Sequence, residues 1–287
     1  MTYDSAPALR AALEQRLSNR AAQTGLGLDR LRRGVLFERI VARLEAAQPG
    51  RWVLKGGMAL EVRLRDDARV TKDIDLGLRD EVETAADLQA HLDEAFAVEL
   101  DDDGFEMVTA KPRTLRADGG GHPTWRVGVT AKLAGREFGR IQLDISPRAH
   151  ELDVTDRIAL PNSLDFAGIP ARTVEIVDVN RHAAEKLHAM FRTFGDRQNS
   201  RVRDLVDVVL LVEHGLLTTG AVASAVRQVW AERDRAEPPA RPDPLPESWP
   251  DRYESLAEDY ELVARTFSAA QAVVGRLWTE MFPRAET

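Results

Sequence analysis

A glycine pair, followed sixteen residues later by an Asp-Ile-Asp triplet, constrains this chain more than any other feature. It lies in "LKGGMALEVRLRDDARVTKDIDLGL", residues 54–78. The apolar "RWVLK" (51–55) predicts a buried strand, which Gly56-Gly57 ends. "MALEVRLR" then predicts a short helix, and the alternation in "DIDLGL" (73–78) predicts a second strand. A strand, a glycine turn, a helix and a strand in succession indicate an α/β arrangement.

The two carboxylates of the triplet belong to one face of that second strand. Asp73 and Asp75 stand two residues apart, so alternation sends both side chains to one side and Ile74 and Leu76 to the other. Like charges so close together repel each other. The sequence alone leaves two explanations open: a solvent-facing edge strand with hydrated acids, or a divalent cation held between the carboxylates.

Other features of the first half favour the cation. Glycines between a strand and a helix let backbone N–H groups approach a phosphate at the positive end of the helix. A later predicted strand, "GRIQLDISP", places Asp144 between two apolar residues. A carboxylate in such surroundings is costly unless it is paired or bound to a metal. Asp144 is therefore the third candidate ligand.

The second half of the chain follows a helical pattern and has its own charged candidates. Lys186 lies in "AAEKLHAM", and Asp204 and Asp207 share one face of "RVRDLVDVV". We expect a mixed-sheet domain with N-terminal helices over residues 1–177 and a helical domain over 178–287. A proline-rich loop or linker is expected at 236–250.

Composition narrows the class of protein. The net charge is −8, and only five of the 39 basic residues are lysines. Any nucleic-acid surface must therefore be a local arginine-lined patch. Without cysteine, disulfides and thiol catalysis are excluded. The chain lacks a long apolar run and a secretory leader pattern, so we expect a cytoplasmic protein with no membrane contact.

Taken together, the motifs "KGGMAL", "TKDIDLGL", "IQLDIS", "AAEKLHA" and "RVRDLVDV" resemble the AbiEii/AbiGii family of nucleotidyltransferase toxins. This family belongs to the DNA-polymerase-β-like superfamily, and the resemblance spans about residues 35–215. It implies an α+β or α/β fold: a nucleotidyltransferase-type mixed sheet with flanking helices, plus a mostly helical C-terminal half. In place of the Ser or Thr that often follows the glycines, this chain has Met58, so phosphate contact must come from backbone N–H groups or other side chains.

The resemblance also implies an activity: transfer of NMP from an NTP, with Mg²⁺ or alternatively Mn²⁺. It assigns the metal ions to Asp73, Asp75 and Asp144, and the triphosphate to Gly56, Gly57 and Lys186, with Arg69 as a further phosphate contact. One or both of Asp204 and Asp207 complete the site. The implied acceptor is RNA, namely the 3′ end of tRNA, and a cognate antitoxin is the implied protein partner.

Several other residues have weaker assignments. Lys72 points away from Asp73 on a strand, which favours a surface charge. The arginines in "FRTFGDRQNSRVR" (191–203) suit an RNA backbone or a solvated loop equally well. His122 and His150 lie in predicted loops without ligand spacing and receive no role.

Three alternative functions stay open. The fold could transfer a nucleotide or a phosphate to a protein. It could serve as a non-catalytic binding module, although the intact acidic triad argues against this. A glycosyltransferase with an Asp-x-Asp metal site is disfavoured by the glycine turn and by the lack of an N-terminal dinucleotide-binding pattern.

Overall fold

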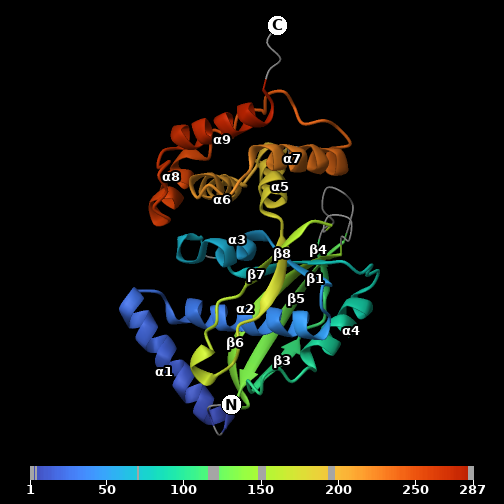
Figure 1. The fold of residues 1–287 in the computed structure, drawn as a ribbon, viewed down its shortest axis with the longest axis vertical. Helices are drawn as coiled ribbons and strands as arrows, with labels where there is room; N and C mark the ends of the chain where they lie inside the picture. Colours follow the sequence, from blue (N-terminus) through green and yellow to red (C-terminus); the bar gives the residue numbers. More distant parts are fainter. Residues whose placement is uncertain are drawn as a thin grey trace. The chain divides into compact units, whose positions relative to one another are not determined.

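The structure is a computed structural model that describes residues 3, 5–69, 71–115, 123–147, 153–192 and 198–283. It divides into two compact units (Figure 1). Unit 1 comprises Met1–Arg63 and Val70–Val177, and unit 2 comprises Leu64–Arg69 and Asp178–Thr287. The six residues Leu64–Arg69, which shortly precede the Asp-Ile-Asp triplet, therefore belong with the C-terminal half.

The described strands of unit 1 form one eight-stranded mixed sheet. Its order is β3-β5-β6-β2-β1-β8-β7, and β4 also pairs with β5. The pairs β2–β6 and β1–β8 are parallel, and the others are antiparallel. The strands are β1 (Trp52–Lys55), β2 (Asp73–Leu78), β3 (Phe105–Thr109), β4 (Arg113–Leu115), β5 (Thr124–Leu133), β6 (Arg136–Pro147), β7 (Thr155–Ala159) and β8 (Thr173–Val177).

Helices cover one face of this sheet. Helix α2 crosses it and packs against β6 and β8, with α1 and α4 beside it (Figure 1). Alternate residues of β5 are buried on this face, and the residues between them are half-buried on the other, polar face. The helices of unit 1 are α1 (Ala6–Thr24), α2 (Leu28–Ala47), α3 (Gly56–Leu64), α4 (Ala85–Phe96) and the short η3 (Asp165–Ala167).

In its described residues unit 2 consists of helices joined by loops and contains no strand. Helix α5 packs on α6 and α7, and α9 packs on α6, α7 and α8. Its proline-rich segment is anchored rather than wholly exposed, because Leu245 and Trp249 are buried and the Trp249 indole donates to the Asn199 carbonyl. The elements are η1 (Arg65–Asp67), α5 (Val179–Phe191), α6 (Val202–Glu213), α7 (Thr219–Asp234), α8 (Pro250–Asp259) and α9 (Phe267–Met281).

The mixed sheet with flanking helices and the helical second half confirm the predicted fold class. The predicted strand at 73–78 matches β2 residue for residue. Strands β4 and β7 and helix α7 were not predicted, because short edge strands and a weakly amphipathic helix leave little periodic signal. None of the described helices is long and apolar enough to cross a membrane.

Candidate active site

A row of charged residues runs across the polar face of the sheet. Pairing places Arg113 of β4 opposite Arg126 of β5, Arg126 opposite Asp144 of β6, Asp144 opposite Asp75 of β2, and Asp75 opposite Lys55 of β1. Residues that pair across neighbouring strands point to the same side. The two central carboxylates are thus flanked by cations on both sides along the row.

Asp73 adds a third carboxylate, one pleat away on the same strand. Its side chain is 42% exposed, whereas the Asp144 side chain is 16% exposed. Ile74 and Leu76 are buried in the opposite direction, as the alternation predicted. The structure therefore brings together all three acidic residues that the sequence singled out in this half of the chain.

Gly56 is required by the position of Asp75. Its φ is +59°, a left-handed conformation that side chains disfavour. A Cβ at this position would lie 1.8 Å from Asp75 Oδ2. The backbone thus approaches the carboxylate more closely than any other residue type would allow as the chain turns from β1 into α3.

Arg126 holds Asp144 in a two-point ion pair. Its Nε donates to Oδ1 at 2.7 Å and its Nη2 to Oδ2 at 2.6 Å. The same Nη2 lies 3.9 Å from Asp73 Oδ2. The hydrogen bonds to Asp144 raise the pKa of Arg126, with further contributions from the charges of Asp144, Asp73 and Asp75 and a smaller opposing effect of burial. Arg126 is thus the counter-charge of the acidic cluster.

The donor chemistry of this cluster fits a hard divalent cation. Carboxylate oxygens are the ligands that Mg²⁺ and Mn²⁺ prefer. A Cβ at position 56 would lie 1.8 Å from Asp75 Oδ2, so the turn places the backbone directly beside this carboxylate. With Arg126 on Asp144, however, no three His, Cys, Asp or Glu residues in the described part of the chain are arranged around one ion position.

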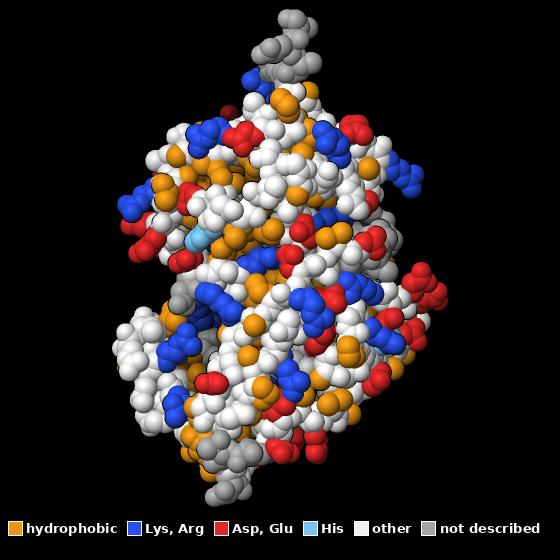
Figure 2. Space-filling view, viewed as in Figure 1, with side chains coloured by type: hydrophobic (Ala, Val, Ile, Leu, Met, Phe, Trp, Pro, Cys, Tyr) orange, Lys and Arg blue, Asp and Glu red, His pale blue; other side chains and the backbone are white. Residues whose placement is uncertain are grey.

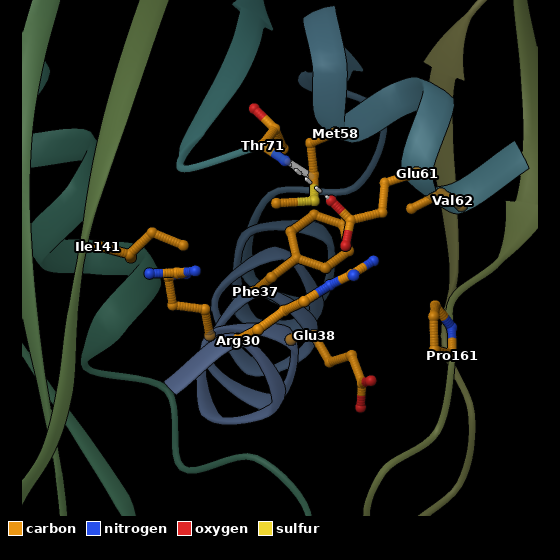
Figure 3. Close-up of a pocket in the computed structure, with 11 residues that line it drawn as sticks. Arg30, Phe37, Glu38, Met58, Glu61, Val62, Thr71, Ile141 and Pro161 are labelled. Atoms are coloured by element: carbon orange, nitrogen blue, oxygen red, sulfur yellow. Dashed lines mark hydrogen bonds between the residues drawn. The ribbon is translucent and has the colours of Figure 1, made fainter. Parts of the chain in front are cut away.

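Met58, the residue after the glycine pair, lies away from the carboxylates. It is buried and lines a small pocket of about 60 Å³ together with Phe37 and Ile141 (Figure 3). Ile141 and Asp144 alternate to opposite faces of β6. The Met58 side chain therefore lies on the helix-covered face. This placement is consistent with the prediction that phosphate contact comes from backbone N–H groups or other side chains and not from residue 58.

A second charged cluster lies in unit 2. Lys186 Nζ donates to Asp204 Oδ1 at 3.1 Å and to Asp207 Oδ2 at 2.5 Å. Arg69 donates to both oxygens of Asp207, from Nε at 2.6 Å and from Nη2 at 2.9 Å. Two cations and two anions thus form a compact network, in which Asp207 has no exposed side-chain surface.

The network keeps its members charged although they are buried. Burial alone would lower the pKa of Lys186, but Asp207 and Asp204 outweigh burial and raise it. Burial would likewise raise the pKa of Asp207, whereas Lys186 and Arg69 lower it overall. Breaking one member of such a network leaves an uncompensated buried charge.

The predicted site residues thus fall into two clusters, each within its own unit. Asp73, Asp75, Asp144 and Gly56 meet in unit 1, and Lys186, Asp204, Asp207 and Arg69 meet in unit 2. A single site containing both clusters stays a prediction. The same holds for phosphate binding by Lys186 and Arg69, whose charged groups already contact aspartates.

The remaining predicted residues add little to either cluster. Lys72 is exposed, as expected for a surface charge. Arg201 approaches Asp204 to 3.7 Å and is 55% exposed, and Arg203 is exposed. Phe194, Arg197 and the two loop histidines, His122 and His150, lie outside the described residues.

Arg126 is the site residue that sequence reasoning missed. It occupies a polar position in the alternating "TWRVGVTAKL", which indicates a residue of the polar face. The Ala134-Gly135 turn predicts that β5 and β6 form a hairpin, but no sequence signal specifies the register shift between Ala131 and Lys132 that places Arg126 opposite Asp144. The face was predictable, but the partner was not.

The distribution of charged side chains on the surface is compatible with a polyanion-binding site that is confined to a small area. Basic and acidic side chains are interspersed over the face drawn in Figure 2. No large field of one sign covers that face. Recognition of a polyanion by this chain, with its net charge of −8, therefore needs a confined group of cations.

The chain matches one family model and resembles several solved structures, two of which follow. The model of the family described as "Nucleotidyl transferase AbiEii toxin, Type IV TA system" matches residues 39–275. The crystal structure of JHP933 from Helicobacter pylori is 16% identical, with a TM-score of 0.42 over 85% of this chain and 88% of that chain. A putative nucleotidyltransferase from H. pylori is 15% identical, with a TM-score of 0.44 over 87% and 93%. No curated protein matches the chain.

Proposed function

Because the chain belongs to the AbiEii family of nucleotidyltransferase toxins of type IV toxin–antitoxin systems, we propose that it transfers NMP from an NTP to the 3′ end of a cellular RNA. The RNA that we propose as acceptor is tRNA. The family description implies a nucleotide substrate and a cognate antitoxin, and nucleotidyltransferases of this kind generally use a divalent cation. Action on cellular RNA would place the activity in the cytoplasm.

The observation that carries the proposal is the meeting of Asp73, Asp75 and Asp144 on one face of the sheet beside the Gly56 turn. Bound there, a divalent cation would neutralise the triphosphate and acidify the attacking hydroxyl. Asp73 and Asp75 would hold it, and Asp144 would join them once its oxygens are free.

The chain's own residues then have separate tasks. The N–H groups at the start of α3 suit the triphosphate, since the positive end of a helix attracts phosphate. In the reaction a bond forms between the 3′-oxygen and the α-phosphorus, the α–β phosphoanhydride bond breaks, and pyrophosphate leaves. Asp144 accepts the proton of the hydroxyl, directly or through water. Lys186 is the proposed point charge for the β- and γ-phosphates.

The acceptor is proposed from two considerations. A chain with a net charge of −8 does not bind polyanions unspecifically, so an RNA end must be recognised at a small cationic site. Capping or extending the 3′ end of tRNA would block aminoacylation and explain toxicity. This second consideration extends the toxin family's description and is an analogy.

The test is incubation of the purified chain with total RNA, Mg²⁺ and each NTP in turn, labelled at the α-phosphate. We expect label in RNA of tRNA length and extra 3′ nucleotides when that RNA is sequenced. A parallel reaction labelled at the γ-phosphate detects phosphate transfer, and gel analysis of protein detects protein nucleotidylation. Label in protein with unchanged RNA ends would replace the RNA proposal by the protein alternative.

A further inference from the structure

Arg126 occupies the oxygens that a cation at the acidic cluster needs. Both Asp144 oxygens accept from its guanidinium, at 2.7 Å and 2.6 Å. Its Nη2 also lies 3.9 Å from Asp73, so one side chain spans two of the three carboxylates. A divalent cation coordinated by Asp144 and this guanidinium therefore compete for the same two carboxylate oxygens.

The Arg126–Asp144 ion pair lies where a cation can replace Arg126 at a low cost in free energy. The Arg126 side chain is 32% exposed and the Asp144 side chain 16%, so water can solvate either group when they separate. In the unit 2 network, by contrast, the Lys186 side chain is 7% exposed and that of Asp207 is fully buried. Partly exposed ion pairs contribute little to stability and separate readily, whereas separating a buried pair leaves an uncompensated buried charge.

We propose that Arg126 is a positioning residue that neutralises Asp144 and Asp73 before loading and must release Asp144 when a divalent cation binds. Arg126 thereby sets the cation affinity of the cluster. It also prevents mutual repulsion of the carboxylates from distorting β2 and β6 while the cation is absent. The proposal rests on the proposed function insofar as that function assigns the cation to this cluster.

The direction of the effect follows from the competition. Replacing Arg126 by Met removes the competitor and leaves Asp144 and Asp73 without the cation that contacts them. The cation then no longer has to displace a two-point ion pair. We expect binding to tighten by about ten-fold, which corresponds to about 1.4 kcal/mol, and the cation-free protein to lose thermal stability.

The experiment titrates the full chain with Mn²⁺ alone, without nucleotide, and follows free Mn²⁺ by electron paramagnetic resonance. Arg126→Met is compared with wild type and with Arg113→Met, which removes one positive charge from the same row one strand further away. We expect at most about a two-fold change for Arg113→Met, because it does not share the Asp144 oxygens. Arg126→Lys keeps the charge without the two-point geometry and should bind Mn²⁺ with intermediate affinity.

A double variant separates competition from general electrostatics. If Arg126 acts through Asp144, Arg126→Met in an Asp144→Asn background should give little further tightening. Equal Mn²⁺ affinity in wild type and Arg126→Met, or equal gains for Arg126→Met and Arg113→Met, would overturn the inference and leave the proposed metal site standing. Absence of Mn²⁺ binding in every variant, including Arg126→Met and Arg126→Lys, would overturn both.

Discussion

The acidic cluster on the sheet of unit 1 and the ion network in the helices of unit 2 use the same residue types in opposite ways. The first has three carboxylates and one arginine in contact with two of them, and the side chains of that arginine and those two carboxylates are 16–42% exposed. The second pairs two aspartates with a lysine and an arginine, and its side chains are 0–11% exposed. The first cluster is partly exposed, and the second is buried with its charges balanced by direct contacts.

This difference predicts different consequences of substitution. Carboxylates at a partly exposed site can be neutralised by a bound cation, and their mutual repulsion lowers the stability of the cation-free fold. A balanced, buried network loses much stability when one member is removed, and Lys186 must leave its aspartates before it can contact a phosphate. We therefore expect substitutions in unit 1 to affect mainly activity, and substitutions in unit 2 to affect stability as well.

The largest expected effect is on catalysis. Asp75→Asn or Asp73→Asn should lower the rate of NMP transfer by about 10³- to 10⁴-fold, about 4–5.5 kcal/mol, while the fold stays intact. Because each change relieves repulsion between carboxylates, the melting temperature of the variant should equal or slightly exceed that of wild type. The rate is measured with α-labelled NTP and the melting temperature by circular dichroism. Substantial remaining activity in both variants would remove the metal assignment.

In unit 2 the order of effects should reverse. Lys186→Met leaves Asp204 and Asp207 buried with too little positive charge, so the free energy of unfolding should fall by about 3–5 kcal/mol. Lys111→Met, at an exposed lysine, is the matched control and should change it by less than about 0.5 kcal/mol. Urea unfolding measures both. A stable Lys186→Met variant would erase the contrast between the clusters, whereas weakened NTP binding by the variant would support the proposed phosphate role of Lys186.

Two glycine substitutions test the close approach of the backbone to Asp75 in the acidic cluster. Gly56 and Gly50 both have positive φ, +59° and +73°. An added Cβ at Gly50 meets only Glu175 Oε1, at 3.7 Å, whereas at Gly56 it meets Asp75 Oδ2 at 1.8 Å. Gly50→Ala should therefore cost about 1 kcal/mol for the left-handed conformation alone. Gly56→Ala should cost about 3 kcal/mol and also displace Asp75, which a combined unfolding and activity measurement would detect. Equal costs at the two positions would show that the close approach is not a constraint.

The smallest expected effect is on the pH dependence of stability, through Glu38, a buried carboxylate without a balancing ion network. Glu38 accepts from the Ser163 N–H and hydroxyl, and burial raises its pKa to about 7. Between its ordinary pKa and 7, the folded protein holds a proton that the unfolded chain gives up, so the free energy of unfolding falls as pH rises. From pH 5 to pH 7 this loss should be about 2 kcal/mol.

Glu38→Gln is the direct check, because glutamine cannot ionise. Subtracting the unfolding free energy of the variant from that of wild type at each pH removes the contributions of other titrating groups. The difference should fall steadily between pH 5 and pH 7 and level off above that range. A flat difference would mean that Glu38 is charged in the folded protein at all these pH values, and hence that burial is compensated there as it is for Asp207.

Much of the fold and part of the site could be predicted because they depend on local patterns. Alternation alone placed Asp73 and Asp75 on one face, and the apolar neighbours of Asp144 identified a strand that carries a polar residue in the core-forming region. The fold class followed from the order of these patterns. The division into domains 1–177 and 178–287 stays a prediction, and the structure groups Leu64–Arg69 with the helical unit, which no feature of that segment indicated.

What the sequence determined by itself is the set of residues capable of the chemistry: a glycine turn, three strand carboxylates, and a lysine with two aspartates on helices. Which charges meet was decided only by the tertiary structure. The register of β5 against β6 places Arg126 on Asp144, and the packing of helices places Lys186 and Arg69 on Asp207. The physical reason is that side-chain direction follows from backbone periodicity within a single element. An ion pair between two elements requires their charged atoms to come within about 3 Å, and that distance is set by the packing of the whole core.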